Sequence, residues 1–292
     1  MVEVIAGIAE LRQRLWIRRS RGASIGLVPT MGALHRWHAA PLEAARAEND
    51  FVVASIFVNP IQFDRAEDLE KYSRTMEDDL RVCGSCGVDL VFAPSAGDLY
   101  PREQMTFVES PVLSAHLCGA HRPGHFRGVA TVVLKLFQIV QPERAYFGEK
   151  DAQQLAIIRR MVEDLNVPVI VAPVATVREE DGLALSSRNK HLTAIEREIA
   201  PVLSRALRNT IDSIARGERR VAALRDAALG IFAQYPEARI EYFEITDPDT
   251  LQPVDRVGGP VLVAGAMWLG STRLIDNMRW PSLTQTAHRR QG

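Results

Sequence analysis

Two histidines three residues apart, His35 and His38, follow an apolar run and a Thr-Met-Gly turn at the expected start of a helix. The unpaired backbone N–H groups and the dipole at a helix start attract anions. The spacing places both imidazole rings on one side of the first turn, where both can donate to the same phosphate. Taken alone, an HxxH pair also fits a structural role or half of a metal site. The rest of the chain must decide between these alternatives.

A second polar segment, Gly148 to Gln154, also follows an apolar run and opens a helical pattern. A lysine ammonium at a helix N-terminus opposes the dipole unless an anion shares the site. Lys150 is therefore a candidate phosphate ligand, with a solvated surface charge as the alternative. Asp151 suits an N-cap, a contact to a ribose hydroxyl or a share in holding Mg²⁺. Gln154 is expected to face the same cleft.

Two more segments carry polar groups directly after apolar stretches. Ser186, Ser187 and Arg188 combine two hydroxyls with a guanidinium on a connector. This combination resembles a clamp that closes on a polyphosphate, and a surface turn is the alternative. Segment 59–63 (NPIQF) offers amides that can recognise hydroxyl and carboxylate groups without adding charge.

A basic, glycine-rich loop at 118–128 precedes another helical pattern. Its arginine, Arg122, is the favoured anion ligand there. His121 and His125 fit structural roles as well.

The elements that must position these residues are short β-branched runs separated by helical patterns. Strands are expected at 24–30, 51–58, 89–94, 144–148 and 168–174, and helices are expected up to about 49 and at 67–83, 128–140 and 151–165. This alternation is typical of a parallel sheet wrapped by helices, so we expect a Rossmann-like, doubly wound α/β domain. Ligands of such sheets bind beyond the carboxyl ends of the strands, where the polar segments lie.

The pattern changes after about residue 190. Helices are expected at 194–217 and 219–235, and strands at 239–247, 259–270 and 271–277. These elements predict a smaller α+β domain. We place the boundary so that residues 1–184 form the first domain and residues 185–292 the second, which suits a chain of 292 residues.

Composition excludes several classes of partner. Thirty-five basic residues balance thirty-six acidic ones, so no overall field would attract nucleic acid or an anionic membrane. No apolar run approaches the ~18 residues of a membrane span, and the N-terminus does not resemble a signal peptide. Three cysteines cannot all pair, which suits a reducing, cytoplasmic location. Cys83 and Cys86 lack a second Cys/His pair, so zinc is only a minor alternative to chance spacing.

Five motifs in a fixed order carry a family resemblance: PTMGALHxxH, SIFVNPIQF, RPGHFRGVATVVLKLF, YFGEKDAQQL and DGLALSSRN. They resemble the pantothenate synthetase (pantoate–β-alanine ligase) family, which is related to class I aminoacyl-tRNA synthetases and other nucleotidyltransferases with an HxGH motif. The likeness runs from about residue 3 to WLGSTRLIDN at 268–277. Five motifs in register make it highly specific.

The resemblance implies a two-step, ATP-dependent reaction. ATP and (R)-pantoate form an enzyme-bound pantoyl adenylate and diphosphate, and β-alanine then attacks the acyl carbon to release pantothenate and AMP. It also implies Mg²⁺, a homodimer, a first domain that binds nucleotide and pantoate, and a second domain that acts as a lid. No protein metal ligands are assigned.

The resemblance assigns roles residue by residue. His38 is the family's proton donor, and His35, Lys150 and Arg188 supply further positive or donor groups for catalysis. Gln62 contacts pantoate and β-alanine, and Gln154 contacts pantoate. The residues assigned to ATP are Met31, Gly32, Ala33, Leu34, His35, Arg36, Trp37, His38, Gly148, Glu149, Lys150, Asp151, Val177, Leu185, Ser186, Ser187 and Arg188.

The chain departs from the family's His-x-Gly-His motif at Trp37, which stands where the family has glycine. That glycine lets adenine and ribose lie against the backbone. An indole of about 150 to 250 Å² would exclude the base if it pointed inward. An indole that points outward, or stacks beside the adenine, would leave part of the activity.

Pro41 is a second departure from the family pattern. A proline in the first helical turn costs little, whereas one further inside removes a helix bond. Three hypotheses stay open: an active ligase, a catalytically inactive relative that keeps the fold and the dimer, and a nucleotidyltransferase that acts on another carboxylic acid.

Overall fold

The computed structural model describes residues 2–35, 38–63, 66–70 and 72–281. By their internal contacts the residues form two compact units. Unit 1 comprises Met1–Pro111, Arg122–Glu149 and Ile157–Ala175, and unit 2 comprises Val112–His121, Lys150–Ala156 and Thr176–Gly292. Sequence periodicity detects only contiguous elements, so it gave no sign of the two short early segments of unit 2. The boundary between residues 184 and 185 stays a prediction.

Unit 1 contains a six-stranded parallel sheet in the order β1-β4-β3-β2-β5-β6. The strands are β1 (Glu3–Ile5), β2 (Ile25–Thr30), β3 (Phe51–Ile56), β4 (Leu90–Phe92), β5 (Arg144–Gly148) and β6 (Ile170–Val174). All six residues of β3 are buried, as the continuous apolar run predicts for a strand covered on both faces.

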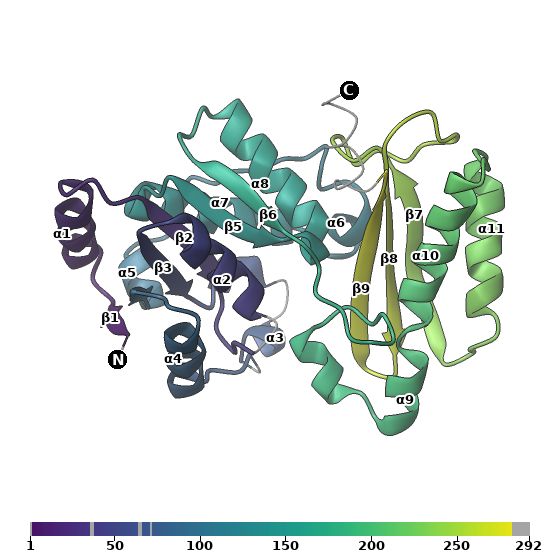
Figure 1. Ribbon diagram of the computed structural model, residues 1–292, viewed down its shortest axis with the longest axis horizontal. Helices are drawn as coiled ribbons and strands as arrows, with labels where there is room; N and C mark the ends of the chain where they lie inside the picture. The colour runs from purple at the N-terminus through teal and green to yellow at the C-terminus, as the bar shows by residue number, and fades with distance from the viewer. Residues whose placement is uncertain (1, 36–37, 64–65, 71, 282–292) are drawn as a thin grey trace. The chain divides into compact units, whose positions relative to one another are not determined.

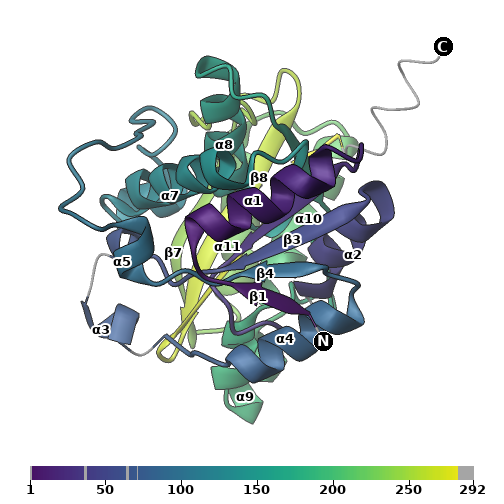
Figure 2. The same cartoon turned by 90° about the vertical axis from the view of Figure 1, so that its left-hand side faces the viewer.

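Helices cover both faces of this sheet (Figure 2). Helices α1 (Ile8–Arg19) and α7 (His125–Val140) pack together on one face. Helices α2 (Ala39–Glu48) and α4 (Met76–Ser85) lie on the other, where Leu42 and Cys83 join the buried side chains of the strands. The expected doubly wound α/β architecture is confirmed. The remaining helical elements of this part of the chain are α3 (Ala66–Glu70), η2 (Pro60–Gln62), α5 (Ala96–Leu99), α6 (Leu117–His121), η3 (Glu149–Asp151) and α8 (Ala152–Asp164).

Unit 2 is built on a three-stranded antiparallel sheet, β7 (Ala238–Thr246), β8 (Val261–Leu269) and β9 (Thr272–Trp280). Helices α10 (Val202–Ala215) and α11 (Val221–Phe232) pack on one face of it (Figure 1). Leu203, Leu207, Phe243, Val263 and Met267 belong to the core between these helices and the strands. Helix α9 (Ala194–Ile199) and the 3-10 helix η4 (Ser187–His191) precede α10. The expected small α+β arrangement is confirmed.

Two expected helices are interrupted, and one strand was not foreseen. The helix expected at 194–217 divides into α9 and α10, because Pro201 has no N–H to continue the ladder and stands as the N-cap of α10. The helix expected at 67–83 divides into α3 and α4, because Thr75 adopts a non-helical backbone and its hydroxyl donates to Asp79. Strand β1 lies in a stretch for which the sequence predicted no strand.

No helix within the described ranges is long and apolar enough to cross a membrane.

Candidate active site

Three neighbouring parallel strands of unit 1 end in polar segments that the sequence singled out. β2 leads into Met31–His35, β3 into η2 with Gln62, and β5 into Gly148 and Glu149. β2 pairs with β3 on one side and with β5 on the other, so the strand order reverses at β2. Open α/β sheets bind their ligands at such a switch point, beyond the carboxyl ends of the strands. The fold therefore brings these residues to the edge where a ligand is expected.

His35 and His38 lie close together at the start of α2, with ring centroids 6.0 Å apart. The His35 N–H donates to His38 Nδ1 at 3.1 Å, and the His38 N–H donates to the His35 carbonyl at 2.8 Å. Because Nδ1 of His38 accepts a hydrogen bond, the neutral ring carries its proton on Nε2. The local backbone thus sets His38 Nε2 as a hydrogen-bond donor.

The η2 segment with Gln62 is fixed to the start of α7. His125 Nδ1 donates to the Gln62 carbonyl at 2.9 Å, and the Asn59 side chain donates to the Gly128 carbonyl at 3.1 Å. Tyr100 donates to Asn59 Oδ1 at 2.8 Å, and burial raises the pKa of Tyr100. A Cβ on Gly128 would lie 2.3 Å from the Ile61 carbonyl oxygen, so only glycine allows this approach. The Gln62 side chain, 9% exposed, is held at the end of β3.

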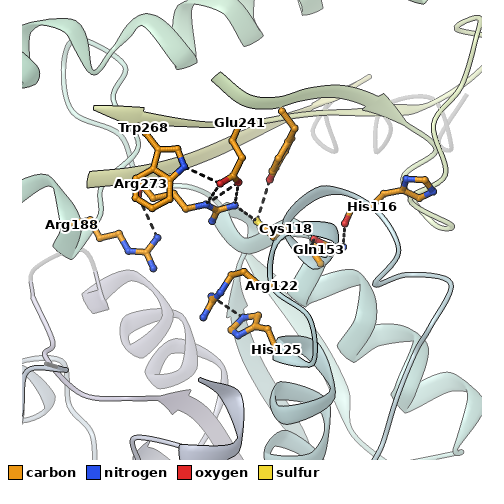
Figure 3. Close-up of polar contacts among 11 residues, drawn as sticks. His116, Cys118, Arg122, His125, Gln153, Arg188, Glu241, Trp268 and Arg273 are labelled. Carbon is orange, nitrogen blue, oxygen red and sulfur yellow. Dashed lines mark hydrogen bonds and ion pairs between the residues drawn. The ribbon is translucent and has the colours of Figure 1, made fainter. Parts of the chain in front are cut away.

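Arg122 and His125 contact each other at the start of α7 (Figure 3). Their Nη1 and Nε2 atoms are 3.3 Å apart, so Nε2 accepts while Nδ1 of the same ring donates to Gln62. His125 therefore has the structural role that the sequence left open. His121 also packs structurally, stacked on Tyr242 at 5.7 Å between centroids within unit 2. Anion binding by Arg122 stays a prediction.

In unit 2, the turn that carries Lys150 is held from β9. The Asn277 side-chain N–H donates to the Lys150 carbonyl at 2.9 Å, whereas Asp151 is exposed. Gln153 is buried and bonds to three backbone groups of the segment 112–121. Its neighbour Gln154 is only half-buried, which leaves Gln154 as the glutamine suited to a ligand.

The segment from Val177 to Arg188 forms a narrow loop in unit 2. The Leu185 N–H donates to the Val177 carbonyl at 3.0 Å, and Arg178 pairs with Ala184 in an antiparallel bridge. Arg178 also forms two short hydrogen bonds to Asp276 of β9, at 2.7 and 2.9 Å.

Beyond that loop, Ser186 and Ser187 are half-buried and Arg188 is exposed. The Ser186 hydroxyl accepts the Arg188 N–H at 3.3 Å, and Arg188 Nη1 donates to the Arg273 carbonyl, also at 3.3 Å. Figure 3 shows this guanidinium next to β9.

A polar cluster on the sheet of unit 2 surrounds the Arg273 side chain (Figure 3). Arg273 Nε and the Trp268 indole N–H both donate to Glu241, at 3.0 and 2.9 Å. Burial acts to raise the pKa of Glu241, but the hydrogen bonds from Arg273 and Trp268 hold that pKa below its usual value. Arg273 Nη2 lies 3.6 Å from Cys118 Sγ, which is 3.1 Å from the Tyr242 hydroxyl. These contacts fix β9, whose Arg273 carbonyl accepts the hydrogen bond from Arg188.

The two departures from the family motif fare differently. Trp37, like Arg36, lies outside the described residues, so the direction of its side chain stays open. Pro41 is the third residue of α2, in the first turn, where its missing N–H would have had no partner within the helix. The helix runs on without interruption to Glu48, so Pro41 occupies a tolerated position.

Two carboxylates that support these segments were missed in the sequence, Asp79 and Asp276. Asp79 accepts the backbone N–H groups of Ala33 and Leu34, in the loop before His35. The signal was an acid on the buried side of a helix, because Asp79 is one turn from Cys83 and both are buried. Asp276 carried no comparable signal, since its partner Arg178 is 98 residues away.

The two cysteines of the CxxC spacing are buried free thiols, and burial raises the pKa of Cys83 to about 12. The residues that the structure describes include no group of three or more His, Cys, Asp or Glu side chains able to hold a metal ion.

Comparisons with known proteins identify the family. The family model described as pantoate-beta-alanine ligase matches residues 3–279. A pantothenate synthetase of Moorella thermoacetica is 52% identical over 277 residues, which cover 95% of this chain and 98% of the relative. One of Sinorhizobium medicae is 53% identical over 277 residues, covering 94% of this chain and 95% of the relative.

Solved structures give the same result. A pantothenate synthetase of Thermus thermophilus superposes with a TM-score of 0.88 at 48% identity and covers 95% of this chain and 99% of its own. A pantoate-beta-alanine ligase of Francisella tularensis, complexed with beta-gamma ATP and beta-alanine, has a TM-score of 0.76 at 34% identity and covers 95% and 97%. The chain therefore belongs to the pantoate–β-alanine ligase family.

Proposed function

We propose that this chain condenses (R)-pantoate with β-alanine at the expense of ATP, giving pantothenate, AMP and diphosphate through a pantoyl adenylate. The observation that carries the proposal is the placement of His35 and His38 at the strand switch point, with the His38 proton on Nε2. The Francisella relative solved with a nucleotide and β-alanine supports the choice of substrates.

In the first step, a pantoate carboxylate oxygen bonds to the α-phosphorus of ATP. The bond between that phosphorus and the oxygen that bridges to the β-phosphate breaks, and diphosphate leaves. Both reacting groups are anionic, so the step needs alignment and charge neutralisation and no protein nucleophile. We assign this work to His35, His38, Lys150 and Arg188. Each preorganised donor would stabilise the transition state by about 2.7 to 4 kcal/mol, by analogy with oxyanion-hole donors.

In the second step, the amine of β-alanine bonds to the acyl carbon, the acyl–oxygen bond breaks, and AMP leaves with that oxygen. The amine loses a proton as the amide forms, and this proton passes to solvent. We assign the proton donor of the reaction to His38, whose neutral ring carries its proton on Nε2.

Recognition is assigned to amides and backbone. Gln62 would contact pantoate and β-alanine, and Gln154 would contact pantoate. These amides would provide selectivity, because a wrong substrate that leaves them without hydrogen-bond partners binds less favourably. The residues proposed to contact ATP are Met31 to His38, Gly148 to Asp151, Val177 and Leu185 to Arg188.

Magnesium is proposed to arrive with ATP as part of the substrate. Mg²⁺ bound to a nucleotide takes its ligands from phosphate oxygens, water and one or two carboxylates. Asp151 is an exposed carboxylate beside Lys150, which fits a single protein contact to such an ion or to the ribose. We also infer a homodimer and a cytoplasmic location, both from the family resemblance.

Trp37 favours one competing hypothesis, a relative that keeps the fold but binds no ATP. The test incubates the chain with ATP, Mg²⁺, pantoate and β-alanine and measures AMP, beside a Trp37→Gly variant. AMP from the unsubstituted chain supports the proposal. AMP from Trp37→Gly alone would show that this sequence is an inactivated ligase, and AMP from neither would contradict the assigned reaction.

A further inference from the structure

Asp79 is a buried carboxylate that binds the loop leading to the two histidines. It lies on α4 and is 1% exposed. Its Oδ1 accepts the Leu34 N–H at 2.6 Å and its Oδ2 accepts the Ala33 N–H at 3.1 Å. The Thr75 hydroxyl donates to Oδ1 at 3.1 Å. All of these residues belong to unit 1.

The loop needs such a partner because its backbone is unusual. Gly32 and Ala33 are consecutive left-handed residues, with φ of +82° and +52°. Alanine rarely adopts this conformation, since its Cβ crowds the following carbonyl. Successive residues in turn conformations point neighbouring N–H groups at one spot, which forms an anion-binding concavity. The Asp79 carboxylate occupies this concavity as a built-in anion.

The fit between the carboxylate and the loop is close. A Cβ on Gly32 would lie 2.8 Å from Asp79 Oδ2 and 3.0 Å from Ile56 Cγ2. The N–H groups of Ala33 and Leu34 are therefore directed into the protein. Because these two N–H groups are bonded to Asp79, they do not contribute to the phosphate contacts that we assign to this loop.

The geometry points to Asp79 as a positioning residue for His35 and His38. Leu34, held by Asp79 Oδ1 and 2% exposed, directly precedes His35. The N–H of His35 in turn donates to His38 Nδ1, the bond that sets the proton of His38 on Nε2. Asp79 thus acts on ATP through the histidines without touching it, and this inference rests on the proposed function.

The chain supplies a matched control one residue away. Asp78 lies on the same helix, its side chain is 58% exposed, and it pairs with Arg81 at the surface. Asp78→Asn and Asp79→Asn make the same change in charge and size, but only the second removes an acceptor from the loop.

The test compares steady-state kinetics of these two variants in the active parent, which is the unsubstituted chain or, if that is inactive, Trp37→Gly. Asn replaces one of the two acceptor oxygens with an NH2 donor, which would face one of the two N–H groups, so Asp79→Asn should raise the KM for ATP by about tenfold or more. The KM for β-alanine should stay within about twofold, and Asp78→Asn should match the parent. A merely structural role would lower kcat with the amount of folded enzyme and leave both KM values unchanged, which would overturn the inference.

A second readout does not depend on activity. Hydrogen exchange of the Ala33 and Leu34 amides in the free protein should accelerate by about tenfold or more in Asp79→Asn but not in Asp78→Asn. Unchanged exchange contradicts the inference whatever the enzyme does. Failure of the proposed function shows differently, as absence of AMP from both the unsubstituted chain and Trp37→Gly. If Asp79→Asn does not fold, Thr75→Val keeps the carboxylate and its bond to the Leu34 N–H but removes the second donor that orients Oδ1, and a severalfold rise in the KM for ATP is then expected.

Discussion

The Arg178 guanidinium donates two hydrogen bonds, of 2.7 and 2.9 Å, to the Asp276 carboxylate, and the Asp276 side chain is 3% exposed. Asp276 Oδ1 also accepts the Asn277 N–H at 2.8 Å, and the Asn277 side chain holds the Lys150 carbonyl. One ion pair in unit 2 thereby links the loop that begins at Val177 with the turn that carries Lys150. Both segments are assigned to ATP, so this link is expected to govern nucleotide binding.

Replacing the Arg178 guanidinium, which donates both hydrogen bonds to Asp276, should lower the stability of the fold and weaken ATP binding. Arg178→Lys keeps the charge but loses the planar, two-bond contact, so we expect destabilisation of about 1 to 3 kcal/mol in urea unfolding and a higher KM for ATP. Arg160→Lys is the control, because Arg160 pairs with Asp164 at the surface of α8. Exposed pairs of this kind contribute only about 0.3 to 0.5 kcal/mol. Equal effects of the two substitutions would contradict the role of the buried pair.

Asn277→Asp should impair ATP binding without a change in size. The substitution replaces the N–H donor with an oxygen that faces the Lys150 carbonyl, so the turn loses a hydrogen bond and gains a repulsion. We expect the KM for ATP to rise by about tenfold. Asn209→Asp, on the exposed side of α10, adds the same charge and should change nothing. If both variants keep the parent's KM for ATP, the proposed role of the Asn277–Lys150 hydrogen bond is contradicted.

Gly128→Ala should displace η2 and with it Gln62. The added Cβ would come within 2.3 Å of the Ile61 carbonyl oxygen and 2.7 Å of Gln62 Cα, and backbone cannot yield cheaply. Overpacking of this kind costs about 1 to 3 kcal/mol, and the KM values for pantoate and β-alanine should both rise.

The control for this change is Gly230→Ala in α11, where nothing lies within 4 Å of the new Cβ. That variant should be more stable by about 0.5 to 1 kcal/mol, because alanine favours a helix over glycine. Thermal unfolding that shows no difference between the two variants would refute the close packing of η2.

Glu241 should make stability fall in acid. Its pKa is lower in the folded protein than in the unfolded chain, so its contribution is present above the unfolded value of about 4.3 and is lost as the pH falls through the folded value. Glu241→Gln removes this dependence. Between pH 5 and pH 2, the melting temperature of the parent should therefore drop more steeply than that of the variant, and parallel curves would contradict the assignment.

Much of the fold could be predicted because its strands are continuous apolar runs and its helices have a clear period. The candidate site was predicted from the rule that polar segments after parallel strands meet at one edge, and its residues stay a prediction. The breaks in the helices were harder to predict, because Thr75 and Pro201 act through single backbone groups inside otherwise helical patterns.

The partners of the two supporting carboxylates could not be predicted, because they are distant in sequence. Asp79 bonds to residues 45 and 46 positions away, and Arg178 is 98 positions from Asp276. Local patterns contain no information on such pairs, which form only when the sheets bring their strands together. The same holds for the discontinuous units, in which two short segments join a sheet formed much later in the chain.

The most direct test of the central claim uses pantoate labelled with ¹⁸O in its carboxylate. If the chain forms a pantoyl adenylate, one pantoate oxygen stays on the α-phosphorus when β-alanine displaces the nucleotide. Mass spectrometry should then find AMP with one ¹⁸O atom and pantothenate with the other. Unlabelled AMP, or ADP and phosphate as the products, would contradict the proposed reaction.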